Sequence, residues 1–182
     1  MMFARRVILC LLIVVICLTR VGWCGDALRP AGLEIFKAQL GHWVGTDTLT
    51  SSANGETVRF SGHYDAAFVL DGTFFSVDGA VSDGKKPFAY KWLYAFDAIE
   101  TKYHAWQFTS SGSVTEFIGT YNPERRELTL QQTSKNPGPV WVTVVRFEED
   151  LVSIVATGRD AEGAIILTGK STYRRSKEKR SE

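Results

Sequence analysis

Three histidines, His42, His63 and His104, are the residues of this sequence best suited to acid–base or metal chemistry. His63 and Asp65 stand two positions apart on a predicted strand, so a carboxylate could orient an imidazole there as in a general-base pair. Arg59 falls on the same face, and an outward polar stripe is the simpler interpretation. A metal site needs three or four converging ligands, and no His-x-His or His-x-x-x-His spacing occurs. We therefore expect no metal site.

The usual signatures of enzymes are missing from the sequence. It contains no Gly-x-Ser-x-Gly element, no phosphate-cradling glycine loop and no dinucleotide fingerprint. An enzyme would have to use a histidine in a cavity or at its mouth, with His104 ahead of His63. The sequence leaves an enzymatic role open but favours none, and it indicates no cofactor.

Aromatic side chains give the stronger indication. They alternate with smaller or polar residues over 87–96, 101–110 and 113–121, as expected for strands with two distinct faces. Aromatic walls with a few polar groups suit an amphipathic small molecule. A solid core is the alternative, because period-two patterning does not show which face is inside. The residues we expect to line a ligand cavity are Tyr90, Trp92, Tyr94, His104, Trp106, Phe108 and Glu116.

The elements that position these residues follow from periodicity and turn signals. Pro30 to Leu40 predicts the one short helix, with apolar residues on one stripe and Gly41 at its end. Asn54-Gly55, Asp71-Gly72 and Asp83-Gly84 suit two-residue hairpin turns. About ten strands are predicted, at 42–52, 56–69, 73–82, 87–96, 101–110, 113–121, 126–134, 139–148, 151–158 and 163–175. A meander of this length avoids exposed edges by closing, so we expect an all-β, antiparallel, up-and-down barrel.

The first 24 residues have the composition of a cleavable signal peptide. Arg5 and Arg6 precede an apolar stretch that ends at Arg20, and small residues follow; cleavage could come as late as residue 27. An uncleaved anchor or a lipoprotein is the weaker alternative, since the apolar run is short and Trp23 precedes Cys24. We expect export to the periplasm or the medium, with residues 25–182 as a single domain and no membrane span in the mature form.

Removal of that leader changes the chemistry of the chain. Cys10, Cys17 and Cys24 are its three cysteines, so the mature chain would have neither disulfides nor thiols. Three of the 21 basic residues would also leave, and 18 against 20 acidic residues gives a net charge of about −2. A nucleic-acid partner would need a clustered basic face. The basic residues of the C-terminal tail, up to Arg180, are better explained as a solvated terminus.

Several motifs resemble known barrel families. Gly41-His42-Trp43 after a short helix resembles the opening of a lipocalin-like barrel, and a series of later motifs resembles the uncharacterised bacterial family called domain of unknown function 1579. Those motifs are 68–75 (FVLDGTFF), 94–97 (YAFD), 103–106 (YHAW), 119–121 (GTY), 128–130 (LTL) and 172–175 (TYRR). The resemblance implies a lipocalin-like (calycin-type) barrel and no established activity.

The resemblance also implies individual roles. Trp43 would fill the closed end of the barrel, and Arg174 or Arg175 would stack on it as a structural closure, with Arg174 placed first. Nitrobindin-like barrels bind haem through a histidine on a late strand, and this chain has none after His104.

Three hypotheses follow, in order of preference. The first is an exported barrel that binds a mostly apolar ligand. The second is the histidine enzyme already described. The third is a protein-interaction module that uses the outer surface or the basic tail. The oligomeric state is not predicted by the sequence.

Overall fold

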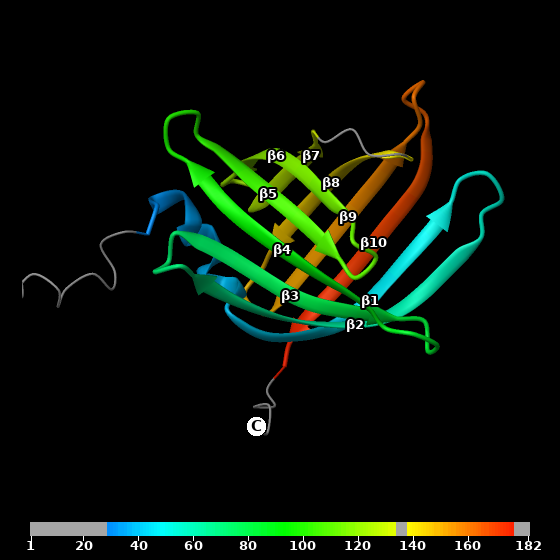
Figure 1. Cartoon of the computed structure of the whole chain (residues 1–182), viewed down its shortest axis with the longest axis horizontal. Coiled ribbons are helices and arrows are strands. Elements are labelled where there is room, and N and C mark those ends of the chain that lie inside the picture. Colours follow the sequence, from blue (N-terminus) through cyan, green and yellow to red (C-terminus); the bar gives the residue numbers. More distant parts are fainter. Residues whose placement is uncertain (1–28, 134–137, 177–182) are drawn as a thin grey trace, which may run out of the picture.

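The computed structural model describes residues 29–133 and 138–176, which form a closed barrel of ten antiparallel strands with one short helix (Figure 1). The predicted signal peptide at 1–24, the three cysteines within it and residues 177–182 of the basic tail lie outside the described residues. No helix of the described ranges has the length and apolarity needed to cross a membrane. The elements are η1 (Ala31–Gln39), β1 (Gly41–Ser51), β2 (Thr57–Val69), β3 (Phe74–Ser82), β4 (Phe88–Asp97), β5 (Lys102–Thr109), β6 (Val114–Asn122), β7 (Glu127–Gln132), β8 (Val140–Phe147), β9 (Leu151–Arg159) and β10 (Ile165–Arg175).

Each strand pairs with its neighbours in sequence, and β1 pairs with β10 to close the barrel. This confirms the predicted all-β up-and-down barrel. Closure removes the unpaired backbone edges that an open sheet of ten strands would expose. One irregularity interrupts the ladder, a register shift between Ile165 and Leu167 in β10.

The turns fall where the sequence places them, but the loops are longer than predicted. Gly55, Gly72 and Gly84 all have positive φ, which explains the glycine at each position. The loops run over 52–56, 70–73 and 83–87. They are therefore four- and five-residue loops rather than two-residue hairpins.

The helix η1 closes one end of the barrel, and the β1–β2 and β9–β10 hairpins lie toward the other end (Figure 1). It is a 3-10 helix whose buried residues include Leu33 and Phe36. The Phe36 ring stacks on Phe75 with centroids 4.4 Å apart. Tyr103 donates a hydrogen bond of 2.7 Å to the Gly32 carbonyl. The helix is thus fixed as a plug against the strand walls.

Trp43 and Arg175 complete the closed end. The Trp43 side chain is fully buried, and the Arg175 guanidinium carbon lies 4.7 Å from the centre of its ring. The expectation that Arg174 fills this role is wrong. Trp43 pairs with Arg175 across β1 and β10. Arg174 instead pairs with Val44, and Arg174 and Val44 are both exposed on the outer surface.

Candidate functional site

A cavity of about 450 Å³ occupies the barrel interior. Phe36 and Gln39 of η1 lie at its floor, and it extends to Phe88 and Thr109 near the opposite end. The cavity is partly open to solvent, and Phe88, one of its lining residues, is 41% exposed. The volume lies within the range of small-molecule pockets. The interior is therefore solid at the helix end and hollow beyond it. The aromatic residues form a packed core in the first part and line a cavity in the second, so each of the two interpretations holds for part of the barrel.

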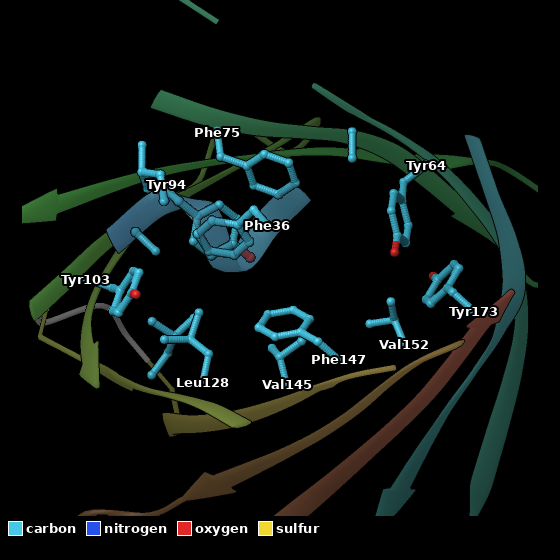
Figure 2. Packing of buried hydrophobic residues seen from close by; sticks show 14 of the residues in the cluster. Phe36, Tyr64, Phe75, Tyr94, Tyr103, Leu128, Val145, Phe147, Val152 and Tyr173 are labelled. Carbon is cyan, nitrogen blue, oxygen red and sulfur yellow. The ribbon is translucent and has the colours of Figure 1, made fainter. Parts of the chain in front are cut away.

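Aromatic rings form much of the cavity wall. Figure 2 shows Phe36 projecting from the helix between Phe75 and Phe147. Further along, Trp92 stacks on Tyr94 with centroids 5.8 Å apart and lies 5.1 Å from Phe117. The aromatic lining residues are Phe36, Phe60, Tyr64, Phe75, Phe88, Tyr90, Trp92, Tyr94, Phe117, Trp141, Phe147 and Tyr173.

A small polar cluster interrupts this apolar wall. The Tyr173 hydroxyl donates a hydrogen bond of 2.6 Å to Oδ2 of Asp47, across the β1–β10 pair. Two glycines make room for the cluster. A methyl group at Gly62 would come within 2.6 Å of the Tyr173 hydroxyl and 2.9 Å of Oδ2 of Asp47, and one at Gly79 would come within 2.6 Å of the Tyr90 hydroxyl. Larger residues at either glycine would displace the polar groups.

The phenols of this cluster stay protonated at neutral pH. Burial raises the pKa of Tyr90 to about 12, with the Tyr173 hydroxyl opposing part of that increase. Burial, together with the neighbouring Tyr90 and Asp47, also raises the pKa of Tyr173 far above its usual value. Tyr173 therefore remains a donor to the Asp47 carboxylate.

Gln39 provides a second polar group, at the floor. Gln39 is only 4% exposed, and its backbone carbonyl accepts a 2.8 Å hydrogen bond from Nε1 of Trp43. Its Oε1 accepts a long 3.4 Å bond from the Tyr64 hydroxyl. Its Nε2 is buried without a hydrogen-bond partner among the residues the structure describes. A buried amide donor of this kind is available to a bound molecule.

The structure separates the seven predicted cavity residues into two groups. Tyr90, Trp92 and Tyr94 of β4 line the cavity. The other four do not, which corrects their expected placement: they are His104, Trp106, Phe108 and Glu116.

His104, Trp106 and Phe108 lie outside the cavity because the other face of β5 points into the barrel. Tyr103, Ala105 and Gln107 form that face, and Ala105 is completely buried while Gln107 lines the cavity. The alternate residues of β5 consequently point outward, where the His104 and Trp106 rings lie 6.2 Å apart in a stacked arrangement.

The structure places the three histidines differently from the predictions. None of them lines the cavity, so the geometric basis for a cavity histidine is lost. Asp65 bonds His42 rather than His63: Nδ1 of His42 lies 2.9 Å from Oδ1 of Asp65, because these residues pair directly across β1 and β2. No cluster of three metal-ligating side chains occurs within 29–133 and 138–176.

Sequence reasoning missed Asp47, Gln39 and Tyr173. A usable signal existed for Asp47, which lies four positions after Trp43 and so shares its face of the strand. If Trp43 points into the barrel, Asp47 points inward as well. An inward-facing carboxylate is unusual, because acidic side chains are seldom buried. No comparable signal marks Gln39, because its role depends on how the helix seats in the barrel.

Comparisons with known proteins bear on the fold. No protein-family model and no curated protein sequence matches the chain, so the resemblance to domain of unknown function 1579 gains no support from them. Among solved structures, the S-type phycobiliprotein lyase CPES from Guillardia theta is similar with a TM-score of 0.61 and 15% identity, over 83% of this chain and 96% of that one. The protein Rv2717c from M. tuberculosis is similar with a TM-score of 0.64 and 12% identity, over 82% and 99%. At these identities the similarity shows a shared barrel fold.

Proposed function

We propose that this protein is a small-molecule-binding barrel that holds a mostly apolar, amphipathic ligand in its aromatic cavity. The observation that carries the proposal is the open cavity of about 450 Å³ above a packed floor. A barrel that served only as a scaffold could fill this space with its own side chains. The similarity to a barrel named as a phycobiliprotein lyase is consistent with the proposal.

The expected affinity for a purely apolar ligand is modest. Burial of roughly 300 Å² of apolar ligand surface contributes about 7.5 kcal/mol at 25 cal/mol per Å². Association costs at least about 4 kcal/mol of that. At most about 3.5 kcal/mol remains, so the Kd should be a few millimolar or weaker before ring stacking or any polar contact is counted.

The proposal can be tested with the purified mature protein. Native mass spectrometry and solvent extraction would identify a retained molecule, and the neutral fluorophore N-phenyl-1-naphthylamine would report on an empty cavity. We expect one bound molecule per chain and quenching of tryptophan fluorescence, because Trp92 and Trp141 line the cavity. A protein that is empty and also fails to bind the fluorophore would contradict the proposal.

We also propose that the chain is exported and that it belongs to the family called domain of unknown function 1579. The composition of residues 1–24 and the order of the motifs support these two statements. N-terminal sequencing of the protein from periplasm and medium tests the first. A mature protein that begins at Met1 would contradict export by cleavage.

A further inference from the structure

Asp47 is the one side chain with a formal charge among the described residues that line the cavity. Every other lining residue is apolar, aromatic or a neutral polar residue, and no lysine, arginine or histidine faces the same space. Charged groups are expensive to hold in apolar surroundings unless they are paired. This carboxylate therefore requires an explanation.

The Asp47 carboxylate can accept more hydrogen bonds than the barrel donates to it. Oδ2 accepts the hydrogen bond from Tyr173, and no ion pair to Asp47 occurs within the part of the chain that the structure describes. A carboxylate offers about four lone-pair sites. Oδ1 and the net negative charge thus remain available to a molecule in the cavity.

The groups around Asp47 favour a cation. Phe60 is its pairing partner on β2. Tyr64 and Tyr173, which lie near each other in Figure 2, both line the cavity, and their ring centroids are 4.9 Å apart. The faces of aromatic rings attract cations. The same surroundings repel an anion, because its charge would face the carboxylate without a compensating base.

The carboxylate is also held in a fixed position. Gly62 removes the side chain that would collide with Oδ2, and Tyr173 fixes that oxygen by its hydrogen bond. A preorganised acceptor binds a charged donor at a low entropic cost.

We propose that the natural ligand of the cavity is a lipophilic amine: an apolar or aromatic molecule whose protonated nitrogen pairs with the Asp47 carboxylate. The apolar part lies among the aromatic walls and points toward the floor formed by Phe36. This inference rests on the proposed function and adds the charge of the ligand. A fatty acid or another anion is excluded by the same geometry.

The test compares three probes with the same chain, decylamine, decanol and decanoate, each used below its micellar concentration at neutral pH. Each displaces N-phenyl-1-naphthylamine from the wild-type protein. We expect decylamine to bind at least about tenfold more tightly than decanol, as a charge-assisted hydrogen bond would give, and decanoate to bind most weakly.

Two matched variants assign the preference to one residue. Asp47→Asn keeps the shape and an acceptor for Tyr173 but removes the charge, and it should bring decylamine to the affinity of decanol while decanol itself changes less than about twofold. Asp78→Asn removes one negative charge from the exposed side of β3, where Asp78 pairs with Lys91, and should leave the order of the three probes unchanged.

The outcomes separate this inference from the proposed function. If all three probes bind alike, or if Asp47→Asn keeps the preference for the amine, Asp47 is only a structural partner of Tyr173 and the inference is overturned, while the binding function stands. If neither the fluorophore nor any probe binds, both fail. Should Asp47→Asn not fold, the order of the probes on the wild-type protein still decides between amine, alcohol and acid.

Discussion

Arg175 should contribute more to stability than any other arginine described in the barrel. Its guanidinium lies over Trp43, donates to the carbonyls of Ala38 and Leu40 at the end of the helix, and pairs with Asp150 at 3.0 Å. One side chain thus connects the last strand, the plug helix and the buried tryptophan. The change Arg175→Ala removes all of these contacts together.

The magnitude can be worked from the contacts. The cation–π contact contributes about 0.5–2 kcal/mol, and each hydrogen bond from a charged donor about 1.5–3 kcal/mol. The ion pair adds little, because Asp150 is mostly exposed. The Arg175 side chain is itself 34% exposed, so solvent screening reduces the sum. We expect Arg175→Ala to lower the free energy of unfolding by about 2–4 kcal/mol.

Urea unfolding followed by tryptophan fluorescence measures this loss, since Trp43 is fully buried. With a slope of about 2 kcal/mol per molar urea, the midpoint should fall by about 1–2 M. The adjacent Arg174 is the matched control, because its side chain is exposed and Arg174→Ala should change stability by less than about 0.5 kcal/mol. Equal midpoints for the two variants would show that Arg175 does not connect the helix to the last strand in a way that stabilises the barrel.

Three further predictions use the same kind of contrast. The Gly45→Ala variant should fail to fold or should unfold at much lower urea, because the added methyl group would lie 2.2 Å from the Thr172 carbonyl oxygen. Gly169→Ala should instead raise the free energy of unfolding by about 0.5–1 kcal/mol, because its methyl group makes only ordinary contacts. Equal effects on the midpoint would contradict this. Stability should be nearly constant from about pH 9 to 10 and fall between about pH 10 and 12. Unfolded tyrosines ionise near pH 10, while burial raises the pKa of Tyr90 and Tyr103 to about 12 in the folded protein. A flat profile from pH 9 to 12 in urea titrations would show this to be wrong. His104→Ala should leave binding of N-phenyl-1-naphthylamine unchanged, since His104 lies outside the cavity, and a large loss of affinity would mean that the outer face takes part.

The barrel could be predicted from the sequence because its signals are local. Turn residues divide the chain at regular intervals, and a helix followed by Trp43 marks the closed end. The strand boundaries agree to within two residues for all ten strands, and the largest differences are at the end of β7 and the start of β10. The lengths of the loops were less predictable, because a glycine with positive φ occurs in two-residue hairpin loops and in loops of four or five residues alike.

Which side of each strand faces inward was harder to predict. On β5 both sets of alternating residues contain large rings, so period two offered no choice between Tyr103 and Trp106. The deciding factor is the space inside, where Ala105 is completely buried while Trp106 is accommodated outside. Adjacent arginines raised the same difficulty, and only the pairing of β10 with β1 distinguishes Arg175 from Arg174.

The polar cluster depends on contacts that no local pattern records. Asp47 and Tyr173 are 126 residues apart in the chain, and the closure of the barrel brings them together. The two glycines that accommodate them look like ordinary turn or bulge residues in the sequence. Such a site becomes visible only when the register of every strand is known.

One pair of variants tests whether the hollow part of the barrel is a binding site. Gly169 lines the cavity and accepts a methyl group without strain, so Gly169→Phe should place a ring in the cavity, while Gly169→Ala leaves it open. The measurement is the stoichiometry and affinity of N-phenyl-1-naphthylamine for both variants, with cooperative urea unfolding as proof of folding. We expect one site per chain in Gly169→Ala and none in a folded Gly169→Phe. Equal binding by the two folded variants would contradict this expectation.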